Sequence, residues 1–300
     1  MKNIIIIGLG NIGKRHLQSF LSSNESLSII CVDKKFPKSQ KFDKRVIKKT
    51  SIENFKINFD ICIISTNSKE RFLLLKSFLS KNTCKNIILE KIIFSNMSQY
   101  LEAVKISNKK SNIYINCPRR SWDSYIKLKK KLNFEHIKLI EINGYNWGLL
   151  SNAIHFIDLF SFLTNEKKLE YVYQNCSSIK LSSKRIGYIE SNGSIIFQNS
   201  NRSLLILNDN KYFKDKNIIN IKTKKKTYEI NESKNLITIK NSKETILKLS
   251  KFSTYLQSDI SKNYLSNISL VSLKNSIVSH KALYDCLKEI FPNRKIFPVS

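Results

Sequence analysis

Three glycines near the start of the 300-residue chain, Gly8, Gly10 and Gly13, form the pattern Gly-x-Gly-x-x-Gly. The pattern follows a short run of isoleucines and precedes a stretch of helical period, so it lies between a predicted strand and a predicted helix. In that context the first glycine permits a tight turn, the second lets the backbone approach a pyrophosphate, and the third lets the helix pack on the strand. The helix N-terminus offers free N–H groups to phosphates, so Asn11 and Ile12 belong to the same expected phosphate loop.

An acidic residue at the end of the next predicted strand makes this interpretation more specific. Asp33 stands twenty residues after Gly13, where a carboxylate accepts hydrogen bonds from the ribose hydroxyls of a dinucleotide. Its charge also repels a 2′-phosphate, so the sequence predicts NAD as the cofactor. Lys34 and Lys35 beside Asp33 keep NADP as the alternative. The other interpretation of the pattern is three ordinary turn glycines.

A lysine at a predicted strand end is suited to charge chemistry. Glu90 and Lys91 directly follow the apolar run Ile87–Leu89, and ligands of parallel sheets bind outside the carboxyl ends of the strands. A compact cation such as Lys91 stabilises negative charge that develops on a substrate oxygen. Because lysines are abundant in this chain, a solvated surface lysine is the alternative.

The second chemical group lies on a predicted helix that begins with Ser151 as the N-cap and runs to about Leu163. Ser151, Asn152 and His155 share one face near the start of this helix, and Asp158 lies one turn further on. His155 can take a proton from a hydroxyl as a general base. A packed structural histidine is the alternative.

Two predicted domains position these residues. Residues 1–118 alternate short β-branched runs with helix-like stretches, which predicts βαβ units and a doubly wound parallel sheet of the Rossmann type. The predicted strands are Asn3–Gly8, Ser28–Val32, Ile61–Ser65, Asn86–Leu89 and Ile113–Asn116, and the predicted helices are Ile12–Leu21, Lys69–Leu79 and Met97–Ile106.

After Pro118 the rhythm changes to short alternating strands, which predict a mostly antiparallel open sheet over residues 119–300. Trp122–Leu132 predicts a connecting helix, Ser191–Gly193 a hairpin turn, and Ser269–Ile290 a closing helix. The predicted fold is an α/β Rossmann domain followed by an α+β substrate-binding domain. We expect the open face of the second sheet to be the surface for any homo-oligomer.

Composition limits the classes of partner. The net charge is +29, but only eight of the 52 basic residues are arginine, and the lysines are spread along the chain. This distribution favours a solvated surface over nucleic-acid binding, which is the other interpretation. No apolar run is long enough for a signal peptide or a membrane span, so we expect a cytoplasmic protein. The six cysteines lack metal-ligand or CxxC spacing, so no metal is expected.

Taken in order, five segments resemble the glucose-fructose oxidoreductase, inositol dehydrogenase and MocA superfamily over nearly the whole chain. The similar segments are Gly8–His16, Ser65-Thr66-Asn67, Glu90-Lys91, Arg119-Arg120 before an aromatic residue, and His155–Asp158. The string from Ser151 to Leu159 is similar to members found beside surface-glycan and nonulosonic-acid biosynthesis enzymes in bacteria.

The resemblance implies reversible hydride transfer between NAD and a secondary alcohol carbon of a sugar or sugar nucleotide. It implies that Lys91 and His155 are catalytic and that the arginines bind a carboxylate or phosphate. The implied substrate-binding residues are Ser151, Asn152, Asp158, Arg119 and Arg120. The implied cofactor contacts are the glycine loop, Asp33, Ser65, Thr66, Asn67, Glu90 and Lys91.

Two positions depart from the family pattern. Ile92 replaces the proline that follows the lysine, and this change affects mainly the loop conformation. Ser151 stands where many members carry a catalytic aspartate. A non-catalytic, nucleotide-dependent sensor or accessory protein of the same fold is therefore the alternative function.

Overall fold

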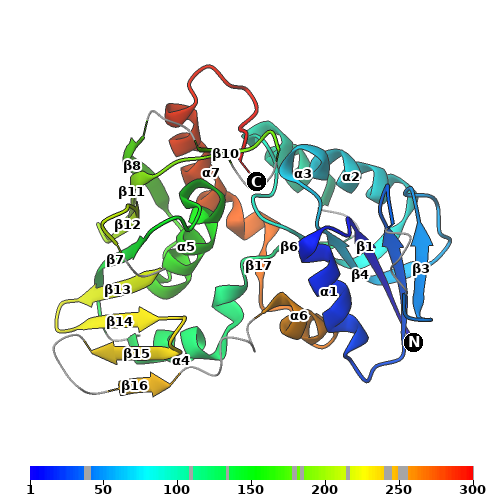
Figure 1. The fold of residues 1–300 in the computed structure, drawn as a ribbon, viewed down its shortest axis with the longest axis horizontal. Helices are drawn as coiled ribbons and strands as arrows, with labels where there is room; N and C mark the ends of the chain where they lie inside the picture. The colour runs from blue at the N-terminus through cyan, green and yellow to red at the C-terminus, as the bar shows by residue number, and fades with distance from the viewer. Residues whose placement is uncertain are drawn as a thin grey trace. The chain divides into compact units, whose positions relative to one another are not determined.

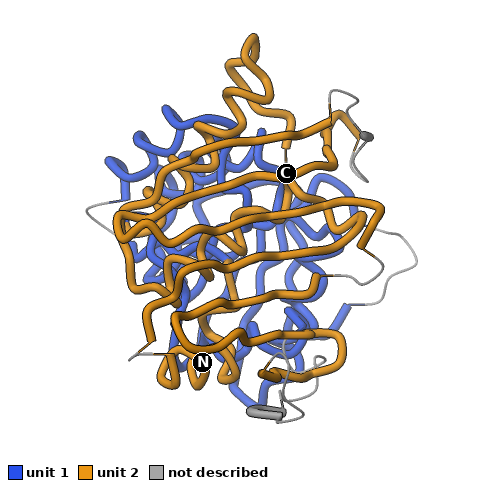
Figure 2. Tube along the Cα trace, turned by 90° about the vertical axis from the view of Figure 1, so that its left-hand side faces the viewer, with its two compact units in different colours: residues 1–116, 253–274 blue, residues 117–252, 275–300 orange. Residues whose placement is uncertain are grey.

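The computed structural model describes residues 1–36, 42–107, 111–132, 135–177, 181–182, 186–213, 217–239, 245–248 and 256–299. The chain forms two compact units, which Figure 2 distinguishes by colour. Unit 1 consists of residues 1–116 and 253–274, and unit 2 consists of residues 117–252 and 275–300.

In the described part of the chain, unit 1 is built on a seven-stranded sheet of order β17-β6-β5-β4-β1-β2-β3 (Figure 1). Its strands are β1 (Lys2–Ile7), β2 (Leu27–Val32), β3 (Val46–Lys49), β4 (Asn58–Ile64), β5 (Thr83–Leu89), β6 (Asn112–Ile115) and β17 (Val271–Ser272). Strands β1 to β6 pair in parallel in the order 3-2-1-4-5-6, whereas β17 pairs antiparallel with β6. In this doubly wound order the winding reverses between β1 and β4, where ligands of such folds bind.

The sequence explains these elements locally. The isoleucines of β1, which lies between β2 and β4, are at most 2% exposed from Ile4 to Ile7, as expected for a strand buried on both faces. The helices of this unit include α1 (Asn11–Leu21), α2 (Ser68–Lys81) and α3 (Met97–Ser107). The short strand β3 carries two lysines at the sheet edge, and its mixed sequence gives no clear strand signal.

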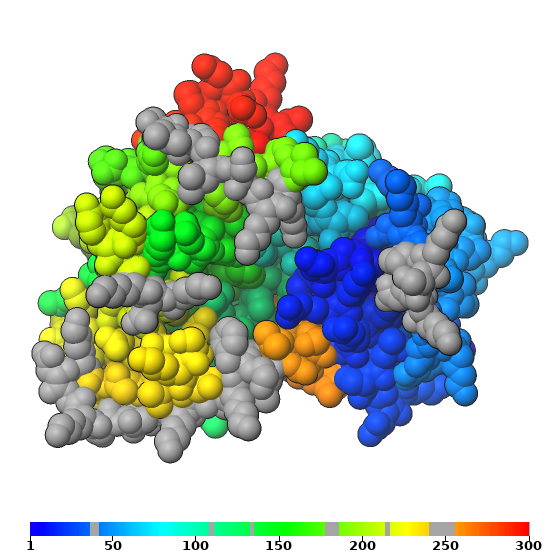
Figure 3. Space-filling model, viewed as in Figure 1, coloured from blue at the N-terminus to red at the C-terminus, as the bar shows by residue number. Residues whose placement is uncertain are grey.

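A late segment of the chain also belongs to unit 1. Helix α6 (Gln257–Ile260), the 3-10 helix η3 (Ser261–Leu265) and β17 pack on α1 and β6. Figure 3 shows the orange surface of this segment directly against the blue surface of the N-terminal residues. The sequence pattern does not indicate this return, because elements of two to five residues are too short to show a period.

Over the residues that the structure describes, unit 2 contains an eight-stranded sheet of order β16-β15-β14-β13-β7-β12-β11-β8. Its strands are β7 (Ile137–Gly144), β8 (Leu169–Cys176), β11 (Gly193–Asn199), β12 (Leu204–Asp209), β13 (Ile218–Thr223), β14 (Thr227–Asn231), β15 (Leu236–Ile239) and β16 (Thr245–Lys248). Neighbouring strands are antiparallel except for β7 and β12, which are parallel. The predicted fold class, a parallel Rossmann sheet and a mostly antiparallel second sheet, is confirmed.

The second sheet has one covered and one open face. Along β7, Ile140 and Ile142 are buried, whereas Leu139, Glu141 and Asn143 are half-buried. Helix α5 (Leu149–Thr164) packs against β12, and the unit also contains η1 (Pro118–Ser121), α4 (Asp123–Leu132) and most of α7 (Leu273–Ile290). Figure 2 draws the strands of this unit side by side in orange.

The predicted hairpin at Ser191–Gly193 is wrong. The strand before it, β10 (Ile189–Glu190), pairs with β9 (Leu181–Ser182), whereas β11 pairs with β8 and β12. Gly193 has a φ of 135°, and a Cβ atom there would lie 2.2 Å from the Asn175 carbonyl oxygen. The glycine is thus needed for close approach to β8 rather than for a two-residue turn.

Candidate functional site

The glycine loop lies between β1 and α1. Gly8 has a φ of 93°, and a Cβ atom at Gly13 would lie 2.0 Å from the Gly8 carbonyl oxygen. Any side chain at Gly13 would therefore push α1 away from the loop. The Ser65 hydroxyl donates to the Gly8 carbonyl at 2.6 Å, so the end of β4 supports this turn.

Asp33 follows β2 and contacts the same loop. Its Oδ2 accepts from the Leu9 amide at 2.6 Å, and its Oδ1 accepts from the Lys35 amide at 3.1 Å. The structure therefore places the carboxylate beside the glycine loop, as a ribose-binding residue requires. Lys34 forms an exposed ion pair with Glu70 at 3.3 Å, which directs its charge toward α2.

The segment after β4 joins the loop to α2. Asn67 is the N-cap of α2, since its side chain accepts from the Glu70 amide at 3.1 Å. A Cβ atom at Gly8 would lie 2.7 Å from Thr66 Cγ2, so Thr66 closes one side of the loop. Ser65, Thr66 and Asn67 thus lie where the sequence analysis expects them, at the carboxyl edge of the sheet.

Glu90 and Lys91 occupy the end of β5, the strand beside β4. The Glu90 amide donates to the Ile64 carbonyl at 3.1 Å, which fixes this end next to residues 65–67. The Glu90 side chain is 6% exposed and accepts from Asn116 Nδ2 at 2.5 Å and from His16 Nε2 at 3.0 Å. The Lys91–Ile92 peptide bond is cis.

The Glu90 carboxylate is stabilised in its ionised form. Burial by itself raises its pKa, but hydrogen bonds from His16 and Asn116 and the charge of Arg71 outweigh burial, so the Glu90 pKa lies below its ordinary value. A buried negative charge is therefore held one residue before Lys91.

In unit 2, the N-cap of helix α5 lies three residues earlier than predicted. Its N-cap is Gly148, with a φ of 77°, so the prediction of Ser151 as the N-cap is wrong. A carboxylate from β10 takes the capping role, because Glu190 accepts from the Leu150 amide at 3.0 Å and from the Ser151 amide at 3.2 Å. A serine before an apolar run is only a weak boundary signal when a distant strand supplies the acceptor.

A second carboxylate holds the loop before α5. Asp209, at the end of β12, accepts from the Asn146 amide at 2.7 Å and from the Trp147 amide at 3.2 Å. Burial raises the pKa of Asp209, and the hydrogen bonds from residues 146–149 offset part of that rise. Sequence reasoning missed both Glu190 and Asp209, since their partners lie about 40 and 60 residues away along the chain.

The predicted substrate-binding residues of α5 share its half-buried face. Ser151, Asn152 and His155 are half-buried, whereas Ala153, Ile154 and other neighbours are buried. Asn152 Nδ2 donates to the Trp147 carbonyl at 2.6 Å. A Cβ atom at Gly148 would lie 2.9 Å from Ser151 Oγ and 3.1 Å from Asn152 Nδ2, so the two polar groups converge on this glycine.

The two predicted anion-binding arginines are engaged by carboxylates of unit 2. Arg119 donates to both oxygens of Glu232, at 2.8 and 2.9 Å, and stacks 4.5 Å from the Phe156 ring centroid. Arg120 donates to both oxygens of Asp158, at 2.8 and 2.7 Å. Burial raises the pKa of Asp158, and Arg120 counteracts that rise. The Arg120 pair joins η1 to α5, and the Arg119 pair joins η1 to the residue after β14. Substrate contacts of Arg119, Arg120 and Asp158 stay a prediction.

A comparison with family models identifies the first domain. Residues 2–116 match the model GFO_IDH_MocA, described as an oxidoreductase family with an NAD-binding Rossmann fold. The match covers the first domain, which is therefore similar to that family. The expected family resemblance and NAD as the cofactor are thereby confirmed for this domain.

Solved structures of the same fold cover nearly the whole chain. The scyllo-inositol dehydrogenase from Lactobacillus casei, with bound NAD(H) and scyllo-inositol, is 17% identical with a TM-score of 0.68 and covers 99% of this chain and 98% of its own. The myo-inositol 2-dehydrogenase from Lactobacillus plantarum is 16% identical, with a TM-score of 0.72 and coverage of 100% and 99%. The transcriptional regulator Gal80p from Kluyveromyces lactis is 16% identical, with a TM-score of 0.71 and coverage of 99% and 91%. A search of curated proteins finds no match.

The glycine loop of this Rossmann domain fits the pyrophosphate of NAD. A Cβ atom at Gly10 would meet nothing within 4 Å, so the loop is open on the side where a phosphate approaches. Gly10 gives the N-terminus of α1 no side-chain cap, and the first turn contains no acidic residue. The N–H groups of this turn are therefore suited to an anionic ligand.

Neither a metal site nor a membrane helix accompanies this domain in the part of the chain that the structure describes. Those residues contain no group of three or more histidines, cysteines and carboxylates that could hold a metal ion. No helix among them is long and apolar enough to cross a membrane.

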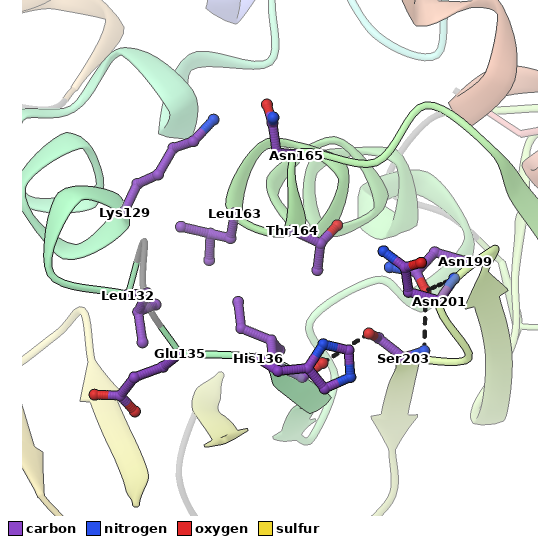
Figure 4. A pocket seen from close by; sticks show the side chains of 11 residues that line it. Lys129, Leu132, Glu135, His136, Leu163, Thr164, Asn165, Asn199, Asn201 and Ser203 are labelled. Atoms are coloured by element: carbon purple, nitrogen blue, oxygen red, sulfur yellow. Dashed lines mark hydrogen bonds between the residues drawn. The ribbon is translucent and has the colours of Figure 1, made fainter. Parts of the chain in front are cut away.

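A separate hollow of about 380 Å³ lies in unit 2, at the other end of α5 (Figure 4). Its lining includes Lys129, Glu135, His136, Thr164, Asn199 and Ser203. The 16 residues of α5 span about 24 Å, so this hollow is remote from Ser151 and Asn152. It is therefore distinct from the substrate site that the sequence predicts.

Proposed function

We propose that the protein is an NAD-dependent oxidoreductase that interconverts a secondary alcohol and a ketone on a sugar or related polyol. The observation that carries this proposal is the position of Lys91 at the carboxyl edge of an NAD-binding sheet, beside residues 65–67. A cation there can act on the oxygen of a substrate that lies against the nicotinamide. We also propose that Lys91 contacts the cofactor, together with Ser65, Thr66, Asn67 and Glu90.

The proposed chemistry divides between two side chains. NAD, when bound, accepts or donates the hydride. His155 takes the hydroxyl proton as general base, and Lys91 donates a hydrogen bond to the same oxygen as negative charge develops on it. Ser151 and Asn152 orient the remaining hydroxyls, since a hydroxyl and an amide can each donate and accept.

The charges of unit 2 favour an uncharged substrate over an anionic one. Both arginines are engaged by Glu232 and Asp158, and the first amides of α5 are taken by Glu190. A phosphate or carboxylate would find no free cation among these groups, whereas sugar hydroxyls suit the amide and hydroxyl groups of α5. The scyllo-inositol bound to the dehydrogenase from Lactobacillus casei is a polyol of this kind.

The wider setting is part of the same proposal. The similarity of residues 151–159 to surface-glycan enzymes supports a step in surface-glycan biosynthesis, in the cytoplasm. The half-buried face of the second sheet is the surface on which we propose homo-oligomer formation. We propose that the protein has no specific nucleic-acid partner.

Turnover with substitutions at the two side chains tests the function. Lys91→Ala and His155→Ala should each lower kcat by about 10² to 10⁴, the usual contribution of a positioned acid or base. The affinity for NAD, which should exceed that for NADP, should barely change because Asp33 and the glycine loop are intact. The substrate panel should contain inositols, neutral sugars and sugar nucleotides. Full turnover in both variants would contradict the assignment, and preference for a sugar nucleotide would contradict the uncharged substrate.

Ser151 favours a second candidate function. The chain has a serine where related dehydrogenases often carry an acid, and Gal80p of the same fold is described as a transcriptional regulator. A nucleotide-dependent sensor would bind NAD and sugars without hydride transfer. Binding of NAD without turnover on any member of the panel would favour this function.

A further inference from the structure

In unit 1, a buried guanidinium binds the backbone of the two residues that follow Lys91. Arg71, on α2, is 0% exposed. Its Nη1 donates to the carbonyls of Ile92 and of Ile93, the latter at 2.8 Å, and its Nη2 donates to the carbonyl of Thr66. One side chain thus ties the two residues after Lys91 to the segment after β4.

A second buried group fixes the residue before Lys91. The Glu90 carboxylate accepts from His16 of α1 and from Asn116 at the end of β6. His16 is 0% exposed, and its Nδ1 lies 2.8 Å from Ser261 Oγ in η3. Asn116 also donates to Gln257 at 2.9 Å, so the network reaches the returning segment of unit 1.

The hydrogen bonds constrain the proton on His16. An ionised Glu90 can only accept, so His16 Nε2 must carry a proton. Ser261 Oγ lies 2.8 Å from the Gln257 carbonyl, so the hydroxyl can donate there and accept from Nδ1, or donate to Nδ1 instead. The hydrogen bonds therefore place a proton on Nε2, toward Glu90, and leave Nδ1 facing the Ser261 hydroxyl.

Fold stability alone does not account for this arrangement. Buried charges cost several kcal/mol of desolvation each, and well-packed apolar residues often stabilise a fold equally well. Here Arg71 binds the carbonyls of the two residues after a single lysine, and His16 binds the buried carboxylate of the residue before it. They also connect that lysine to residues 65–67 and to the helix of the phosphate loop.

We propose that Arg71 and the His16–Glu90 pair are positioning residues that together hold the backbone of Lys91 at the edge of the cofactor site. We call these three residues the Lys91 clamp. The effect of the clamp on turnover rests on the proposed function of Lys91, whereas its effect on local structure does not.

The test uses variants that keep a polar side chain but cannot form the same set of hydrogen bonds. Arg71→Lys keeps the charge but cannot reach three carbonyls as a planar fork does. His16→Gln keeps one donor toward Glu90 and loses the second nitrogen. Arg45→Lys is the matched control, since Arg45 is half-exposed in the same unit and binds Asp43 and the Leu21 carbonyl.

Two measurements need no substrate. Amide hydrogen exchange of the peptide 90–95 should rise about tenfold in Arg71→Lys and His16→Gln, while β4 exchanges as in the wild type. The acylation rate of Lys91, read by peptide mass spectrometry, should change at least about threefold relative to that of Lys34, whose side chain is 84% exposed. With an identified substrate, kcat should fall about tenfold with little change in the Kd of NAD.

Two outcomes would overturn the clamp. Unchanged exchange at 90–95 and unchanged Lys91 acylation would show that the lysine is held by other contacts. Exchange that rises equally in all strands, with a lower Tm, would show a purely structural role. If Arg71→Lys does not fold, Ser261→Ala is used in its place, since it removes only the partner of His16 Nδ1. This variant should still raise the amide hydrogen exchange of peptide 90–95, and unchanged exchange would contradict the clamp. A protein with the expected exchange but no turnover would refute the proposed function and leave the clamp intact.

Discussion

At the scale of single residues, Glu90 illustrates how a carboxylate stays ionised inside a sheet edge. Two donors, His16 and Asn116, converge on the same oxygen, and Arg71 adds a nearby positive charge. These interactions outweigh the desolvation that would otherwise neutralise the group. The sequence indicates Glu90 through its place after a strand, but nothing in the sequence indicates its three partners.

The lowered pKa of Glu90 predicts a pH-dependent loss of stability. Since the folded-state pKa lies below the ordinary value of 4.5, the ionised carboxylate stabilises the fold fully above about pH 4.5, and this contribution is lost as the pH falls through the folded-state value. Glu90→Gln should lower the free energy of unfolding by about 1 to 3 kcal/mol at pH 7. Urea unfolding should show that the difference between wild type and variant is constant from pH 7 to 5 and shrinks toward pH 3. A difference that does not depend on pH would contradict the ionised state.

At the scale of elements, the sequence predicts the features that depend on neighbouring residues and misses those that depend on residues distant along the chain. Strands β1, β2, β4, β5 and β6 of unit 1 and the helix of His155 follow from local period and composition. The glycine loop follows from the backbone room that it needs. The start of α5 does not, because Glu190 reaches it from a two-residue strand. The hairpin at Ser191–Gly193 fails for a related reason: Asn-Gly permits a turn, but pairing of β11 with β8 and β12 is decided by tertiary packing.

The capping of α5 predicts the effect of removing Glu190. Glu190→Ala should lower the free energy of unfolding by about 1 to 2 kcal/mol, because two first-turn amides lose their acceptor and the helix dipole loses a negative charge. Adding Ser151→Asp should restore part of this loss, since an acid in the first turn again faces the helix N-terminus. Urea unfolding measures both effects, with the exposed Glu170→Ala in the same unit as the control. Equal stability of Glu190→Ala and wild type would contradict the cap.

At the scale of the whole molecule, the excess of basic residues is not concentrated in one segment of the chain. With 52 basic and 23 acidic residues, at least 29 basic side chains have no acidic partner of their own, whatever the fold. The basic residues are spread over both units. The ion pairs of Lys2, Lys34, Lys49 and Lys76 are all at least partly exposed. Such charge acts mainly through solvation and long-range repulsion between copies.

This distribution predicts weak, salt-sensitive binding of nucleic acid without a defined site. Affinity for duplex or single-stranded DNA should lie no tighter than about 10⁻⁶ M at about 150 mM salt, and it should fall steeply between about 50 and 200 mM because each phosphate contact releases a counterion. Fluorescence anisotropy with labelled DNA measures both quantities. Saturating NAD provides the control: it should leave the DNA affinity unchanged, since lysines spread over the surface do not compete for the glycine loop. A sub-micromolar Kd at about 150 mM salt that NAD weakens would instead locate nucleic-acid binding in the Rossmann domain, and the lysine excess would then have a specific function.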